Sequence, residues 1–245
     1  MSGKHNLLTL DSITKRFGGL VAVNALSFEV ESNSVHGLIG PNGSGKSTTL
    51  NLLSGALPLS GGEITLDHSR LTNLPAHQIS KLGISRTFQL VRLLPSLTVT
   101  ENVMVGGLFG HRPHGFRDAD RAVSTVLDRV GLGGKGGLMP GQLTYIDTKR
   151  VELARALISQ PRVLLLDEWL AGLNPTELEA GIDLIASLRE ECEAIIVVEH
   201  VMEAIRSLCD RCVVMASGTK IAEGDVETVL NQPTVIEAYL GGADD

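Results

Sequence analysis

The chain has no excess of positive charge and no apolar run long enough to cross a membrane. Its 21 Lys and Arg are outnumbered by 28 Asp and Glu, which gives a formal net charge of -7. Proteins that bind nucleic acid through its phosphates usually present a positive field, so we expect no nucleic-acid partner. The longest apolar runs, VLLL at 163–166 and AIIVV at 194–198, are much shorter than the roughly 20 residues of a transmembrane helix.

The amino-terminal stretch MSGKHNLLTLDS has no apolar core and no small-residue cleavage site, so it does not resemble a secretory signal. We therefore expect a soluble, intracellular protein that is able to dock on a membrane protein.

Cysteine and histidine are too sparse to indicate a metal centre. Cys209 and Cys212 form a single CxxC pair, whereas a structural zinc site needs a second pair of ligands at suitable spacing. We interpret them as two small apolar residues at a junction between a helix and a strand. The histidines of HRPHG, at 111–115, fall in a Pro/Gly-rich stretch that is typical of a solvated loop.

Short apolar runs alternate with amphipathic stretches along most of the chain. Such alternation predicts an α/β fold with a mostly parallel sheet covered on both faces. The predicted strands are 35–40, 162–168 and 194–200, followed by helices at 46–57, 175–191 and 201–210. The opening third carries strand-like stretches at 6–17, 26–32 and 62–68, which predict antiparallel hairpins.

The middle of the chain has a different character. Strand signals fade, 117–132 predicts a helix, and the glycine-rich 131–142 predicts a flexible connection. We expect a helical insertion over 87–160 in a core made of 1–86 and 161–245.

The segment GPNGSGKST satisfies the phosphate-loop pattern G-x-x-x-x-G-K-[ST] and stands between a predicted strand and a predicted helix. Its glycines allow backbone N–H groups to curl around phosphate oxygens, and the helix N-terminus adds a favourable partial charge. Lys46 supplies a positive charge to the β- and γ-phosphates, and the Ser47 hydroxyl can bind Mg²⁺. A chance glycine turn would not combine the full motif with this context.

Acidic and basic side chains end the later strands. Asp167 and Glu168 follow VLLL, where the first can hold the shell of a metal ion and the second can polarise an attacking water. His200 follows AIIVV. Because the carboxyl ends of parallel strands meet at one edge, we expect these groups to converge on the γ-phosphate.

With these motifs in this order, the whole chain resembles the ATP-binding subunits of ATP-binding-cassette (ABC) transporters. The resemblance implies a P-loop NTPase fold with an antiparallel β subdomain and an inserted helical subdomain, and it implies ATP and Mg²⁺ as ligands. KRFGG resembles the A-loop, in which Phe17 would stack on adenine near Val23. RTFQ places Gln89 as the Q-loop glutamine, beside Mg²⁺ and the attacking water. AGLNP resembles the D-loop, and EH places His200 as the switch histidine.

The resemblance assigns three groups of site residues. Catalysis would rest on Glu168, His200 and Gln89, and the metal would contact Ser47, Gln89 and Asp167. The nucleotide would be held by Phe17, Val23, Asn42, Gly43, Ser44, Gly45, Lys46, Ser47 and Thr48.

Several stretches, including GISRTFQ, EHVMEAI and the terminal VIEAYLG, look most like ATPases of branched-chain amino acid importers. That subgroup pairs with two permease subunits and a periplasmic or extracellular solute-binding protein, so the chain would sit at the cytoplasmic face of the membrane. Related importers of amides, urea or aromatic acids share these stretches.

The signature element departs from the family pattern. Where the subgroup has LSYGQ, this chain reads LTYID, with Ile146 in place of a glycine and Asp147 adding a carboxylate. In the family this element, here Thr144, Tyr145, Ile146 and Asp147, completes the ATP site of a partner subunit. A carboxylate would repel the phosphate unless it turns away, and a β-branched residue resists positive φ. Trp169 and Leu170 also stand where the family has proline and a small residue.

We therefore expect a chain that hydrolyses ATP when a partner supplies an intact signature, in a heterodimer with an unlike ATPase. The alternatives are a non-transport ABC ATPase and a regulatory subunit of low turnover. The first usually has tandem cassettes, coiled coils or zinc modules, none of which the sequence shows. The altered signature favours the second, whereas the intact Glu168 and His200 oppose it. A P-loop kinase would not account for Gln89, AGLNP and His200.

Overall fold

The computed structural model describes residues 5–113 and 116–240, and its N-terminal part forms an antiparallel sheet. The strand order is β2-β1-β4-β5. The strands are β1 (Asn6–Phe17), β2 (Leu20–Glu31), β4 (Gly61–Leu66) and β5 (Ser69–Arg70). The predicted antiparallel hairpins are confirmed, although β2 begins six residues before the predicted 26, because its first half pairs with the end of β1.

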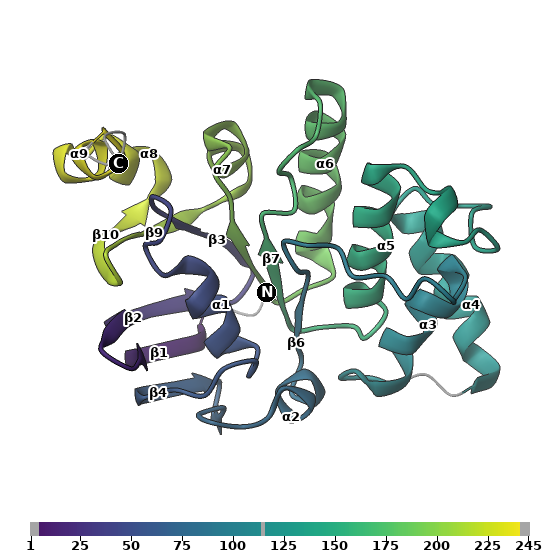
Figure 1. Ribbon diagram of the computed structural model, residues 1–245, viewed down its shortest axis with the longest axis horizontal. Coiled ribbons are helices and arrows are strands. Elements are labelled where there is room, and N and C mark those ends of the chain that lie inside the picture. Colours follow the sequence, from purple (N-terminus) through teal and green to yellow (C-terminus); the bar gives the residue numbers. More distant parts are fainter. Residues whose placement is uncertain (1–4, 114–115, 241–245) are drawn as a thin grey trace.

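The second sheet contains the functional strands. Its order is β10-β9-β3-β8-β7-β6, and within this sheet, over the described residues, β9–β10 is antiparallel and the other pairs are parallel. The strands are β3 (Ser34–Ile39), β6 (Ile84–Arg86), β7 (Val163–Asp167), β8 (Ala194–Val198), β9 (Arg211–Ala216) and β10 (Thr219–Asp225). The mostly parallel core sheet is confirmed (Figure 1).

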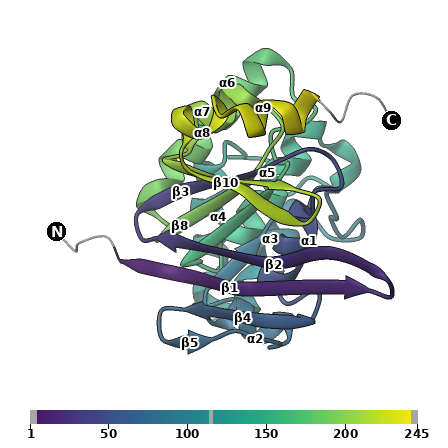
Figure 2. The same cartoon turned by 90° about the vertical axis from the view of Figure 1, so that its left-hand side faces the viewer.

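Helices cover both faces of this sheet, as continuous apolar strands require. In β7, Val163 and Leu165 face the cluster that includes α1 (Lys46–Leu53) and the antiparallel sheet, whereas Leu164 and Leu166 face the other cluster. The second cluster draws on α6 (Pro175–Ser187), α7 (Met202–Leu208), α8 (Val226–Leu230) and α9 (Pro233–Leu240). Figure 2 shows the antiparallel strands β1, β2 and β4 on the opposite side of the molecule from α6 and α9.

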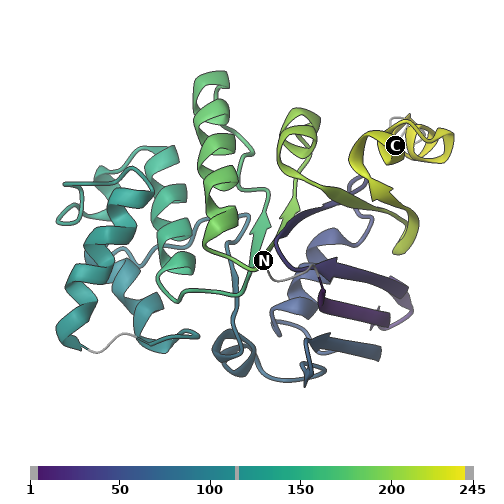
Figure 3. The same cartoon turned by 180° about the vertical axis from the view of Figure 1, so that it is seen from behind.

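The connection between β6 and β7 is helical. It contains α3 (Val99–Phe109), α4 (Phe116–Arg129), the 3-10 turn η1 (Pro140–Gln142) and α5 (Tyr145–Leu157). These helices lie together at one end of the molecule, away from β1 and β2 (Figures 1 and 3). Two short helical elements lie elsewhere, α2 (Ala76–Lys81) and the turn η2 (Leu188–Glu190). The boundaries 87 and 160 of the insertion stay a prediction.

Local sequence explains where the helices of the insertion begin. Thr98 accepts from the Glu101 N–H, and the Glu101 carboxylate accepts from the Thr98 N–H, which forms a capping box on α3. The Thr144 hydroxyl caps α5 by accepting from the Asp147 N–H at 3.3 Å. The altered signature therefore still starts a helix.

Cys209 and Cys212 lie at the junction between α7 and β9, as predicted. Both thiols are buried, and burial raises the pKa of Cys209 to about 12 and that of Cys212 to about 11. Such thiols are unreactive at neutral pH. His111 contacts the Lys81 carbonyl at 2.8 Å, whereas His114 lies outside the described residues. Within the described ranges, no helix is long and apolar enough to span a bilayer.

Candidate active site

The phosphate loop connects β3 to α1, and its shape depends on two glycines. Gly40 has φ 148° and Gly45 has φ 104°. A Cβ on Gly40 would lie 2.1 Å from the Met215 carbonyl oxygen, and one on Gly45 would lie 2.6 Å from the Ala22 carbonyl oxygen. Both the conformation and the space therefore require glycine at these positions.

Lys46 starts α1, and its ammonium folds back over the loop. It donates to the carbonyl oxygens of Gly40 at 2.8 Å and Pro41 at 2.9 Å. Burial lowers the pKa of Lys46, and the negative charges of Glu168 and Asp167 partly oppose that shift. The ammonium thus lies within the field of both acids. The other predicted phosphate-loop residues occupy the same loop and the first turn of α1: Asn42, Gly43, Ser44, Ser47 and Thr48.

Asp167 ends β7 and is paired with a residue that the motif search missed. Arg86, at the end of β6, donates to Asp167 Oδ2 at 2.6 Å and to Asn51 Oδ1 at 2.6 Å. Asp167 Oδ1 is buried without a hydrogen-bond partner in the described structure. A carboxylate oxygen in this position fits a Mg²⁺ ion or a water of its shell, as a hard cation prefers.

Glu168 brings the predicted catalytic groups together. Its Oε1 lies 2.6 Å from His200 Nε2, and its Oε2 accepts a hydrogen bond from Gln89 Nε2 at 2.6 Å. Because the carboxylate can only accept, His200 carries its proton on Nε2 in this contact. The side chains come from the ends of β7 and β8 and from the segment after β6, so the parallel strands deliver them to one edge as expected.

The two residues predicted for the base lie on the β1–β2 hairpin. Phe17 ends β1 with its ring 45% exposed, and the Lys15 ammonium lies 5.1 Å from the ring centroid. Val23 is buried, and a Cβ on Gly45 would lie 3.4 Å from its Cγ2. Gly218 joins this hairpin to the phosphate loop, because it accepts from the Asn24 N–H and donates to the Ser44 carbonyl.

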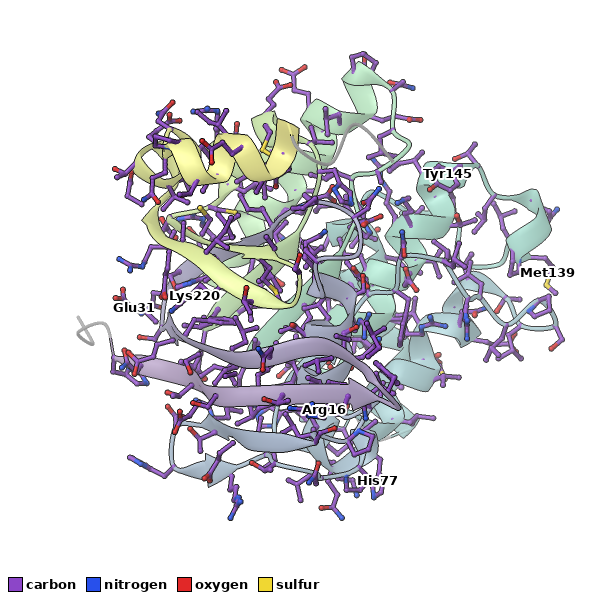
Figure 4. The ribbon with its side chains drawn as sticks, turned by 60° about the vertical axis from the view of Figure 1, so that its left-hand side comes forward. Arg16, Glu31, His77, Met139, Tyr145 and Lys220 are labelled. Atoms are coloured by element: carbon purple, nitrogen blue, oxygen red, sulfur yellow. The ribbon has the colours of Figure 1, made fainter. Side chains whose placement is uncertain are left out.

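The signature element lies in a separate part of the chain. Figure 4 shows Tyr145 at the start of α5 and Met139 nearby, both remote from Arg16 near the end of β1. Tyr145 is 54% exposed and Thr144 is also exposed, so the start of the element faces outward. The structure therefore does not bring Thr144, Tyr145, Ile146 and Asp147 to this chain's own phosphate loop.

The Asp147 carboxylate turns inward, which is the arrangement that would avoid the predicted repulsion of phosphate. It accepts from the Lys135 ammonium at 2.7 Å, and only 6% of its side chain is exposed. Burial raises its pKa, but the hydrogen bonds from Lys135 and Thr144 outweigh that effect and leave the pKa below its ordinary value. Ile146 is half-buried against the core.

Two further charged residues that sequence reasoning missed surround Glu168. Lys149 is 2% exposed and donates to the carbonyl oxygens of Glu168 and Trp169. Glu199 is 1% exposed and accepts from the Leu170 N–H. The apolar periodicity of a helix does not indicate that a lysine such as Lys149 is buried. For Glu199, the sequence offers no pattern beyond its place next to His200.

The comparisons with known proteins agree with this geometry. Residues 23–171 match the ABC transporter family, and residues 219–245 match the branched-chain amino acid ATP-binding cassette transporter family. The chain is 42% identical to the high-affinity branched-chain amino acid transport ATP-binding protein LivG of Salmonella typhimurium, over 97% of this chain and 98% of that protein. It is 39% identical to BraF of Pseudomonas aeruginosa, a protein of the same description, with the same coverage.

Solved structures show the same fold. A nucleotide-free ATP-binding cassette from an ABC transporter aligns with a TM-score of 0.87 and 27% identity, over 96% of this chain and 99% of that one. An ATP-binding cassette in its ADP conformation aligns with a TM-score of 0.86 and 28% identity, over 97% and 99%. The chain therefore belongs to the ABC transporter family, as one of its ATP-binding ATPase proteins.

Proposed function

We propose that this chain hydrolyses ATP to drive the import of branched-chain amino acids through a membrane permease. The similarity to LivG and BraF over nearly the whole chain supports the solute class. The observation that carries the catalytic part is the arrangement at Glu168, whose two carboxylate oxygens contact Gln89 and His200.

In the proposed reaction, Glu168 orients a water for in-line attack on the γ-phosphate. Lys46 neutralises phosphate charge, and it is already held over the loop by two carbonyl oxygens. Gln89 and His200 hold the Glu168 carboxylate in place and lie on the side of the site where the γ-phosphate would bind. Ser47, Asp167 and Gln89 would hold Mg²⁺, which when bound would supply positive charge to the phosphates.

The partner in this proposal is a second ABC ATPase, arranged head to tail. The outward position of Tyr145 supports a site completed between two chains, because the signature cannot serve its own phosphate loop in this arrangement. The inward-facing Asp147 removes the charge objection to the element. Ile146, which replaces a glycine, remains the reason to expect that this chain contributes weakly to its partner's ATP site. We therefore expect an unlike partner whose own signature is intact.

The permease would dock on the segment that follows Gln89, together with Phe88 just before it. Phe88, Leu90 and Leu94 are 45%, 72% and 43% exposed, which is unusual for large apolar side chains. Burying them against two permease subunits would place the chain at the cytoplasmic face of the membrane and link it indirectly to a solute-binding protein. Movement of this segment would reach Glu168 through Gln89.

The proposal is tested by measuring ATP turnover of this chain alone, of a mixture with the second ATPase, and of mixtures with Glu168→Gln in one subunit. We expect Glu168→Gln to retain ATP binding and to lose turnover by about 100-fold or more. Uptake of labelled leucine into vesicles that contain the co-purified permease tests the solute. Full-speed, cooperative hydrolysis by this chain alone would contradict the weak half-site.

A further inference from the structure

Glu168 requires support from its surroundings, because its backbone is in a conformation that side chains rarely adopt. Its φ is +49°, in the left-handed region, although it is not a glycine. A residue in this region keeps its conformation only when neighbouring groups fix it. Its N–H donates to the Val198 carbonyl at 2.8 Å, which holds the side of the residue that faces β8.

Helix α5 holds the other side through a buried lysine. The Lys149 ammonium donates to the carbonyl oxygen of Glu168 at 3.2 Å and to that of Trp169 at 2.9 Å. It also lies 5.2 Å from the centroid of the Tyr145 ring, where a cation is attracted to the π face. A buried ammonium is tolerated only with such partners, and two of the three fix the backbone that follows Glu168.

The contact is reciprocal. Trp169 Nε1 donates back to the Lys149 carbonyl oxygen at 3.1 Å, so each residue binds the main chain of the other. The Trp169 side chain is 2% exposed. Space for it and for Leu170 comes from Gly181 on α6, where a Cβ would lie 2.6 Å from Leu170 Cδ2 and 3.2 Å from Trp169 Cζ3.

A third contact joins the same segment to the switch histidine. Glu199, which precedes His200, accepts from the Leu170 N–H at 2.6 Å. The backbone from 168 to 170 is thus held by α5 on one side and by the residue beside His200 on the other.

We propose that Lys149 and Trp169 are positioning residues that couple the start of α5 to the orientation of Glu168. Lys149 lies one helical turn after Tyr145, so a nucleotide that contacts the N-terminus of α5 acts on the same turn that holds Glu168. This role in communication rests on the proposed head-to-tail partner, whereas the positioning of Glu168 is a property of the chain itself. Neither side chain touches substrate.

For kcat, the test uses the full-length chain mixed with the second ATPase, whose own catalytic glutamate is changed to glutamine, and compares wild type with Lys149→Met, Lys149→Arg and Trp169→Phe. Lys220→Met is the control, since Lys220 also binds a carbonyl oxygen, that of Ser27, and neither residue belongs to the predicted site. We expect Lys149→Met to lower kcat at least tenfold, with the KM for ATP and the Kd of ATP within twofold of wild type. Lys149→Arg should recover most of the loss, because it restores a buried cation with donors. Trp169→Phe should also lower kcat and leave the KM and Kd for ATP nearly unchanged, since it removes the indole N–H and keeps an aromatic ring.

A second readout does not depend on turnover. Trp169 is the single tryptophan of the chain, so its emission reports directly on this contact. We expect ATP to change Trp169 emission in wild type and in Lys220→Met, and to leave it unchanged in Lys149→Met. If Lys149→Met does not fold, Trp169→Phe and Lys149→Arg decide the kinetic part. An unaltered kcat in folded Lys149→Met and Trp169→Phe would overturn the proposal. Equal losses in kcat and ATP affinity would also overturn it, whereas a wild-type chain that neither binds nor hydrolyses ATP would refute the proposed function instead.

Discussion

The buried ion pair between Arg86 and Asp167 is the charge contact whose loss should cost this protein the most stability. Arg86 is 6% exposed and Asp167 is 2% exposed, and the charged atoms are 2.6 Å apart. In Arg86→Met, the Asp167 carboxylate stays buried without its cation, and its other oxygen already has no partner. Breaking a buried pair from one side costs about 3–5 kcal/mol. That is a large fraction of the roughly 5–15 kcal/mol by which most domains are stable.

The measurement is urea denaturation of the nucleotide-free chain, followed by far-UV circular dichroism. Arg70→Met is the control, because its ion pair with Glu63 is exposed, at 67% and 44% for the two side chains. Exposed pairs contribute about 0–1 kcal/mol, so this variant should change little. The double variant Arg86→Met with Asp167→Asn should recover at least about 2 kcal/mol of the loss, because it removes the uncompensated charge.

Two results would refute this reasoning. One is an Arg86→Met loss no larger than that of Arg70→Met. The other is a double variant no more stable than Arg86→Met alone, because the cost would then not come from the stranded carboxylate.

Variants at four other positions test separate parts of the structure. Burial raises the pKa of Glu152 to about 7 from an ordinary 4.5, so its contribution to the free energy of unfolding falls as pH rises from about 4.5 to 7. Glu152→Gln should therefore remove on the order of 3 kcal/mol of pH dependence between pH 4 and 8 in urea titrations. Lys135→Met should lower stability by about 1–3 kcal/mol because it strands the inward Asp147 carboxylate, whereas Lys135→Arg should not. Phe17→Ala should raise the Kd of ATP about three- to tenfold in equilibrium binding and leave single-turnover hydrolysis unchanged. Ile146→Gly should raise turnover of the partner's site in the mixture and destabilise α5 by about 1 kcal/mol or more in thermal melts.

Motifs with an inherent local geometry could be predicted from the sequence. The phosphate loop required glycine at Gly40 and Gly45, and the structure gives both a positive φ. The convergence of Glu168 and His200 followed from the rule that parallel strands end at one edge, and β7 and β8 do so. The predicted range 6–17 of the first strand is also that of β1, whose aliphatic residues are all buried in one cluster: Leu7, Leu8, Leu10 and Ile13.

Contacts between distant segments could not be predicted in this way. A lysine in a helix is usually exposed, yet Lys149 is buried. Its ammonium donates to the carbonyl oxygen of Glu168, which lies in a distant segment of the chain. Arg86 follows the same logic, since only the pairing of β6 with β7 brings it to Asp167. The early start of β2 at Leu20 depends on its partner strand rather than on its own pattern.

Three of the four departures from the family pattern, Asp147, Trp169 and Leu170, are matched by a complementary residue nearby. Asp147 has Lys135 as its cation, and Trp169 has Lys149 as its acceptor and Gly181 as its space. Without Lys135, the buried Asp147 carboxylate would have no cation. With a larger residue at Gly181, the Trp169 ring would collide with it. Neither problem is present among these described contacts. The altered letters around α5 therefore form a consistent local structure. If the proposed contact with a partner's phosphate holds, we expect any functional deficit of the signature to come from Ile146 itself and not from the fold that supports it.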